Sequence, residues 1–83
     1  MEIIELAEEI INFCVKYRLL GNPKKIIKSK DRVIQELGNI VFVESLIHML
    51  ILKTKYIHNV DNNRLKVLLV ELEKVRLDLE YDK

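Results

Sequence analysis

The stretch that decides the fold runs from Ile40 to Leu52 and reads IVFVESLIHMLIL. Only Glu44, Ser45 and His48 interrupt its apolar side chains, and at about 100° per residue on a helix these three share one strip. A helix that is apolar around most of its circumference is normally buried on most sides. We therefore expect this helix to form the centre of the protein, with the other segments packed around it.

Two helices are expected before this stretch. The first covers about Ile3 to Leu19, where apolar residues recur at helical spacing and glutamates fill the opposite side. Gly21-Asn22-Pro23 follows as a turn, with Gly21 suited to a left-handed stop and Pro23 to the first position of the next helix. The second helix then covers residues 23–37, and its pattern allows a break at 28–30, where Ser29 or Asp31 can restart it.

The last expected helix covers about Asn62 to Leu79, with Asp61 as its cap, and it carries two apolar stripes. One is a seam suited to the core, made of Leu65, Leu68, Leu72, Val75 and Leu79. The other consists of Val67, Val70 and Leu77 on a different face. This second stripe is either further core, if the helix is sandwiched, or a surface for a partner. Because the seam already supplies a core contact, we predict that the stripe binds a partner protein or a second copy of the chain.

Length and composition place these helices in one domain. Eighty-three residues with two glycines and one proline favour helices over turns and strands. Short connections between helices make neighbours antiparallel. The sequence therefore predicts an all-α, antiparallel four-helix bundle with up-down topology, forming a single domain over residues 1–83.

The chain has the features of a soluble cytoplasmic protein. A single cysteine, Cys14, excludes an internal disulfide and suits a reducing compartment. The first residues, MEIIELAEEI, are acidic where a signal peptide needs basic ones. The central run of 13 residues is shorter than the ~20 that a bilayer requires. We expect cytoplasmic localisation and no transmembrane segment.

The candidate chemical groups favour structural roles. Glu44 and His48 share a helix face, but no second ligand motif accompanies them, so a strip facing solvent or a groove is the preferred interpretation. Cys14 lies in line with Ile10 and Tyr17, as a small buried hydrophobe would. No phosphate-binding loop or nucleophile motif is present. We expect no enzymatic activity, no cofactor and no metal.

Charge is segregated along the chain. Residues 16–32 hold seven basic residues and one acid, and residues 1–15 hold four glutamates. Lys24, Lys25 and Lys28 are the candidate partner-binding residues of this basic block, which is either a solvated face or a contact for an anionic protein or membrane surface. Nucleic acid is the least favoured partner, because a helix-turn-helix would need the apolar central helix as its exposed reader.

The second half of the chain resembles the immunity proteins that protect producers of pediocin-like (class IIa) bacteriocins. The resemblance covers about residues 33–79. It rests on Leu37-Gly38-Asn39 leading into a long apolar helix that ends at residues 51–57, on the polar turn Asp61-Asn62-Asn63, and on the leucines of the last helix. It implies a small cytoplasmic four-helix bundle that acts by binding without chemistry.

Two functions therefore remain open at this point. The resemblance implies an immunity protein that binds a bacteriocin-occupied membrane receptor of the sugar-uptake phosphotransferase type, with the last two helices carrying specificity. The alternative is a phage- or plasmid-type regulatory bundle that binds a host protein, or less favourably nucleic acid, through the basic segment from Lys16 to Arg32.

Overall fold

The structure is a computed structural model that describes residues 1–19 and 29–81. The four helices in these ranges are α1 (Ile3–Lys16), α3 (Lys30–Glu36), α4 (Ile40–Thr54) and α5 (Asn62–Tyr81). Neither range contains a strand. The predicted all-α four-helix bundle is thereby confirmed.

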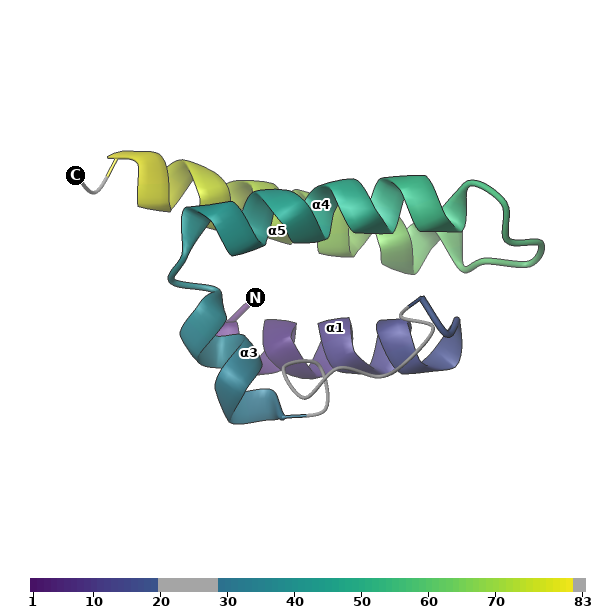
Figure 1. Cartoon of the computed structure of the whole chain (residues 1–83), viewed down its shortest axis with the longest axis horizontal. Coiled ribbons are helices and arrows are strands. Elements are labelled where there is room, and N and C mark those ends of the chain that lie inside the picture. The colour runs from purple at the N-terminus through teal and green to yellow at the C-terminus, as the bar shows by residue number, and fades with distance from the viewer. Residues whose placement is uncertain (20–28, 82–83) are drawn as a thin grey trace.

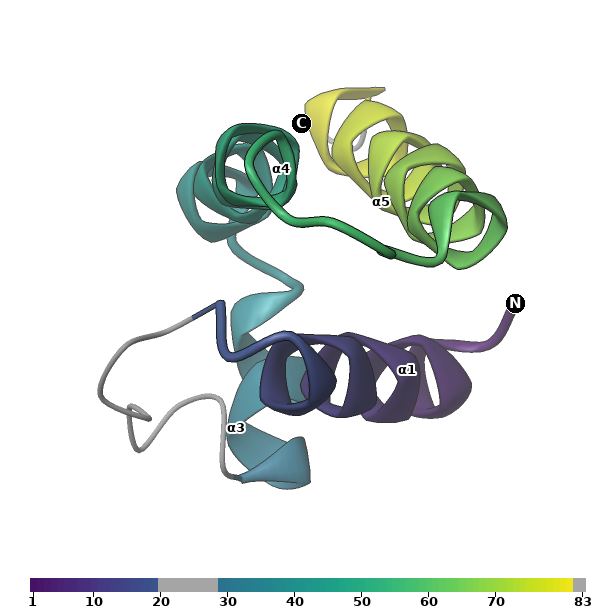
Figure 2. The ribbon, with the colours of Figure 1, turned by 90° about the vertical axis from the view of Figure 1, so that its right-hand side faces the viewer.

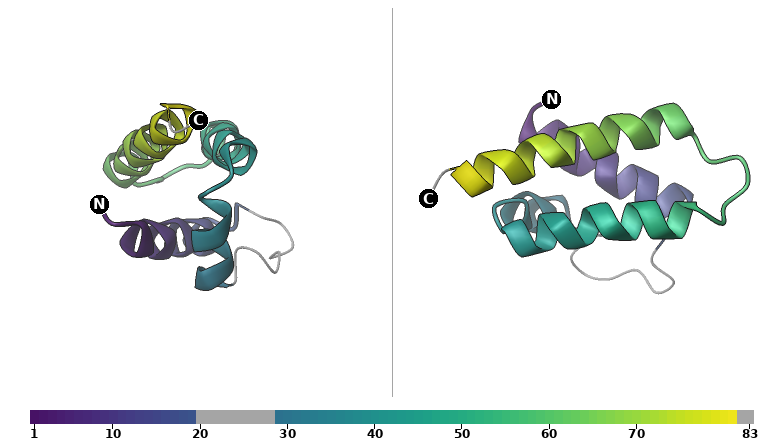
Figure 3. Two further views of the ribbon diagram at one scale, coloured as in Figure 1. Left: turned by 90° about the vertical axis from the view of Figure 1, so that its left-hand side faces the viewer. Right: turned by 90° about the horizontal axis from the view of Figure 1, so that it is seen from above.

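The helices form two layers (Figures 1 and 2). An antiparallel hairpin of α4 and α5 makes one layer, and the most extensive contact among the described helices lies within it. The other layer consists of α1, which crosses beneath the hairpin, and the short α3, which packs against α1. The chain turns by 112° between α3 and α4, so α3 stands steeply to the hairpin (Figure 3).

One hydrophobic core joins all four helices. Its largest fully buried side chains come from every element: Leu6, Ile10 and Phe13 from α1, Val33 from α3, Val43 and Leu50 from α4, and Leu68 and Leu72 from α5. In each of the longer helices the buried positions recur every three or four residues, which is the spacing of one helix face. The predicted seam of the last helix thus does face the core.

The expectation that α4 is surrounded by the other segments is wrong. Its buried residues, Val43, Leu46, Leu50 and Thr54, occupy one side only. On the other side Val41 and Leu52 are 65% and 59% exposed. The bundle places α5 and the lower layer against one side of α4 and leaves nothing among the described residues to cover the other. A small domain has too little interior to bury every apolar side chain it contains.

Helix starts follow the predicted caps. The Asn39 side chain accepts a hydrogen bond from the Val41 amide at 3.0 Å, and Asp61 accepts one from the Arg64 amide at 3.1 Å. The Ser29 hydroxyl accepts from the Arg32 amide at 3.3 Å and opens α3. The predicted restart at Ser29 is therefore confirmed, while the rest of the expected second helix, residues 23–28, lies outside the described residues.

The end of α1 differs from the prediction. The helix stops at Lys16, not near Leu19, and Arg18 takes the left-handed conformation with φ at 51°. The Leu19 amide then donates to the Cys14 carbonyl at 3.1 Å, closing the last turn. This stop places Leu19 in the core, where it is buried. Gly21, the expected left-handed residue, lies outside the described ranges.

Tyr17 ties the end of α1 to the start of α5. Its hydroxyl oxygen accepts a hydrogen bond from the Asp61 amide at 2.8 Å. Its ring packs against Phe13 with centroids 4.7 Å apart. The contact fixes the α4–α5 turn against the lower layer, and it was not evident from the sequence because its partners are far apart along the chain.

Truncation of the core side of α4 should destabilise the protein far more than truncation of its outer side. Leu50 is fully buried, so L50A should lower the free energy of unfolding by ~2–5 kcal/mol in urea denaturation. The matched change L52A on the exposed side should cost less than ~0.5 kcal/mol. Equal losses at both positions would show that α4 is surrounded after all.

Removing the Tyr17 hydroxyl should have a smaller, local effect. Y17F deletes the acceptor of the Asp61 amide but keeps the ring packing, so the loss should be ~0.5–1 kcal/mol of unfolding free energy. Y56F is the control, since Tyr56 is exposed. Faster amide exchange near Asp61 in Y17F alone would identify the loop contact as the cause, and identical stability of both variants would contradict it.

Candidate interaction surface

The outer face of α5 carries the predicted second stripe on the side away from the core. Val67, Val70 and Leu77 are 48%, 47% and 39% exposed. Lys74 and Tyr81 continue the same line, because the intervals from 67 to 81 alternate between three and four residues. We call Val67, Val70, Lys74, Leu77 and Tyr81 the outer face. Tyr81 was missed as a member, although its spacing from Leu77 is the signal that identifies it.

Charged residues border the outer face on both sides. Lys66, Glu73 and Glu80 form the lane on one side, and Arg64, Glu71 and Asp78 form the lane on the other. The Lys74 ammonium pairs with Glu71 at 3.0 Å, and the amino group of Met1 lies 3.0 Å from the other oxygen of that carboxylate. The hydrogen bond from Lys74 is the main reason that the pKa of Glu71 lies below its ordinary value.

Arg76 forms ion pairs with two glutamates of the lane that faces α4. Its Nε donates to Glu73 Oε1 at 3.0 Å and its Nη1 donates to Glu80 Oε2 at 3.0 Å. The hydrogen bond to Arg76 lowers the pKa of Glu73, and the same bond is the main cause of the raised pKa of Arg76. Glu44 on α4 adds a smaller charge effect that also raises the pKa of Arg76.

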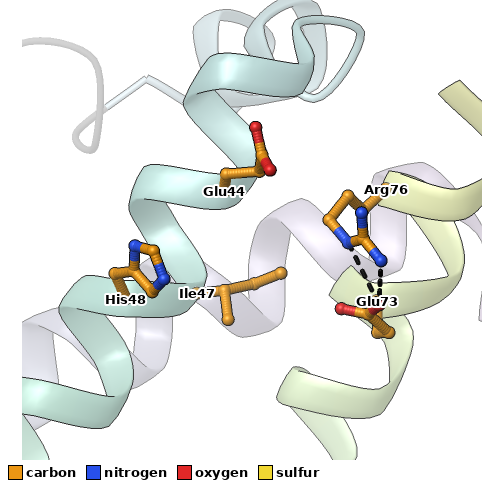
Figure 4. Close-up of a pocket in the computed structure, with 5 residues that line it drawn as sticks. All are labelled: Glu44, Ile47, His48, Glu73 and Arg76. Atoms are coloured by element: carbon orange, nitrogen blue, oxygen red, sulfur yellow. Dashed lines mark hydrogen bonds and ion pairs between the residues drawn. The ribbon is translucent and has the colours of Figure 1, made fainter. Parts of the chain in front are cut away.

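A shallow pocket of about 140 Å³ lies between α4 and α5 (Figure 4). Glu44, Ile47 and His48 line it from α4, and Glu73 and Arg76 line it from α5. The predicted strip of Glu44 and His48 therefore borders a groove. In the described ranges no three His, Cys, Asp or Glu side chains are placed to hold a metal ion together. In this pocket the carboxylate of Glu73 is already hydrogen-bonded to the guanidinium of Arg76.

The structure describes only part of the basic block. Lys24, Lys25 and Lys28 lie outside the described residues, so their predicted partner contact stays a prediction. Of the two described members in or next to α3, Lys30 pairs with Glu8 at 3.4 Å and Arg32 approaches Glu36 at 3.9 Å. Both cations thus already have an acidic neighbour within the bundle.

Cys14 lies in the core, as its position on the apolar line predicts. Burial raises the pKa of its thiol to about 11. At pH 8 only about one thiol in a thousand is then ionised, and the thiolate is the reactive form. The buried position of Cys14 and the raised pKa of its thiol favour a role in core packing over a reactive role.

Comparisons of the chain with protein-family models, with curated proteins and with solved structures gave no match. Among the described residues no helix by itself is long and apolar enough to cross a membrane, and α3 and α4 meet that criterion only as a pair bent by 112°.

Cys14 should react slowly with thiol reagents in the folded protein. At pH 8, labelling with iodoacetamide should be at least ~100-fold slower than in urea-unfolded chain, since both burial and protonation suppress attack. Mass spectrometry over time gives both rates. Folded protein that labels as fast as unfolded protein would place Cys14 at the surface.

Proposed function

We propose that the protein is a non-enzymatic, cytoplasmic binding protein of the bacteriocin-immunity type. It protects the cell by binding a membrane receptor that a pediocin-like bacteriocin has occupied. The surface that makes this contact belongs to the hairpin of α4 and α5. The function is one of recognition, so it requires a stable scaffold and an exposed, partly apolar face.

The observation that carries this proposal is the uncovered apolar surface of the hairpin. Val41 and Leu52 on α4, and Val67, Val70 and Leu77 on α5, are all exposed. Apolar residues in line on one helix face, bordered by charges, are typical of a protein-binding surface. The two helices that carry them are the two for which the resemblance to immunity proteins implies specificity.

The polar groups of the hairpin also support binding over catalysis. Within the α4–α5 pocket, Arg76 and Glu73 neutralise each other, and the thiol of Cys14 is buried in the core away from it. An active site normally holds a titratable group whose pKa suits proton transfer or attack. The hydrogen bond between Arg76 and Glu73 instead stabilises the charged form of both groups, so it lowers the pKa of Glu73 and raises that of Arg76.

Expression in a bacteriocin-sensitive strain tests the proposal. Cells that produce the protein should survive a class IIa bacteriocin at concentrations that kill the same strain without it. The double variant V70S/L77S should lose this protection, because it removes apolar surface from the hairpin. Loss of a contact worth ~1.4 kcal/mol is a tenfold change in affinity.

The control is V15S, which changes an exposed valine on α1, outside the hairpin. It should protect as well as the parent protein when immunoblots show equal amounts. Failure of the parent protein to protect against a panel of pediocin-like bacteriocins would refute the immunity function. Equal loss in V15S and V70S/L77S would refute the assignment to the hairpin.

A further inference from the structure

The outer face of α5 has the spacing of a coiled-coil seam. Val67, Lys74 and Tyr81 fall at a positions and Val70 and Leu77 at d positions of a seven-residue repeat. The residues turned to the core, such as Leu68 and Leu72, fall at positions on the opposite side of the same repeat. This helix therefore offers one face to its own bundle and a second, regular face to another helix.

We propose that the outer face binds the outer face of a second copy of this chain, with the two α5 helices antiparallel. This inference rests on the part of the proposed function that makes the hairpin a binding surface. It gives the outer face of α5 a second partner, which would compete with the receptor for the same residues. A dimer formed in this way is related by a two-fold axis, so the same surface serves both subunits.

The position of Lys74 in the seam favours antiparallel over parallel pairing of the two α5 helices. In a parallel pair, residues at the same position face each other, so two Lys74 ammonium groups would meet in the centre of the seam. In an antiparallel pair an a position faces a d position. Lys74 then lies opposite Val70 of the second copy, and Val67 lies opposite Leu77. The stem of each lysine can cover a valine while its ammonium reaches Glu71, its neighbour in the structure.

The bordering charges complement each other in this arrangement. With Val67 opposite Leu77, the lane on the α4 side places Lys66 against Glu80 of the other copy. The lane on the other side places Arg64 against Asp78. Each pair occurs twice because of the two-fold symmetry, which gives four attractive contacts. Lys66 and Asp78 form no ion pair within the described part of their own chain, while Glu80 is 3.0 Å from Arg76 and Arg64 is 3.2 Å from Glu9. The contacts between copies would therefore extend these existing pairs, with one unpaired charge in each contact.

Two carboxylates would meet their own copies near the axis, and the structure shows how each is neutralised. Glu71 is paired with Lys74 and with the amino group of Met1. Glu73 is held by Arg76. The acids that would repel are therefore compensated within each chain. Shifting the antiparallel register by one repeat toward the C-terminus would instead set Glu73 against Glu80 and Glu71 against Asp78, which is repulsive.

The contact spans only four layers of side chains, which makes the dimer weak and reversible. Stable interfaces bury about 1,200–2,000 Å², and a single short helix pair covers less. We expect a dissociation constant between about 10 µM and 1 mM, a range that sedimentation equilibrium of the full chain can measure. V70S/L77S should weaken association at least about tenfold while circular dichroism shows unchanged helix content.

Charge-reversal variants test the antiparallel geometry. K66E sets two carboxylates against each other at the 66/80 contacts, and E80K sets two ammonium groups there. Each variant alone should associate about three- to tenfold more weakly than the parent chain, because two weak, solvent-exposed attractive contacts become repulsive. An equimolar mixture should regain parent-like association, because both contacts then join opposite charges. K53E, which makes the same charge change on the exposed end of α4, should associate normally.

The proposal is overturned if the parent protein is still monomeric at a concentration of about 1 mM. It is also overturned if V70S/L77S associates as strongly as the parent protein. Normal association of E80K alone together with weakened K66E would show parallel helices, in which Lys66 faces Glu71. The bacteriocin assay separates this inference from the proposed function. Protection by K66E at the parent level, with its dimer lost, would show that immunity does not need the dimer. A dimer without protection would refute immunity and leave the pairing of α5 intact.

Discussion

A chain of 83 residues can enclose little apolar surface, and in this protein each long helix buries one side only. Phe13, Leu50 and Leu72 belong to one core that lies between two layers. The α4–α5 hairpin forms one layer, and α1 and α3 form the other. With 49% hydrophobic residues, more apolar side chains exist than this core can hold. The remainder lies on the surface, and its arrangement there determines what the protein can bind.

The layers are held in place by a few polar contacts at their edges. Tyr17 joins the end of α1 to the start of α5, and Arg64 of α5 pairs with Glu9 of α1 at 3.2 Å. These contacts are mostly exposed, so each adds little free energy. Their role is to fix where α1 crosses the hairpin, and in this position none of the described residues covers the outer face of α5.

Helix types and starts were predictable because they depend on local chemistry. Asn39, Asp61 and Ser29 cap helices in the structure, as their side chains and positions indicate. The seam of α5 was predictable for the same reason, since helical periodicity identifies a face. The burial of α4 was not, because a composition that is apolar all round does not reveal how many neighbours a helix will have. Nor was the contact of Tyr17 with Asp61, which depends on how distant segments fold together.

The two faces of α5 differ in their surroundings. The inner face, with Leu68 and Leu72, is buried in the core, and the outer face, with Val67, Val70 and Leu77, is exposed among the described residues. This division would let so small a protein carry an interaction surface without losing its core. In the proposed pairing of two α5 helices, the charges beside the outer face set the direction of the second helix.

The most direct test is a dilution series of ¹⁵N-labelled protein followed by NMR. If the outer faces of two copies pair, the amide signals along residues 67–81 should shift with concentration, with little change in α1. Shifts confined to other helices, or spectra that do not change with concentration while α5 stays helical, would contradict a binding role between copies for the outer face.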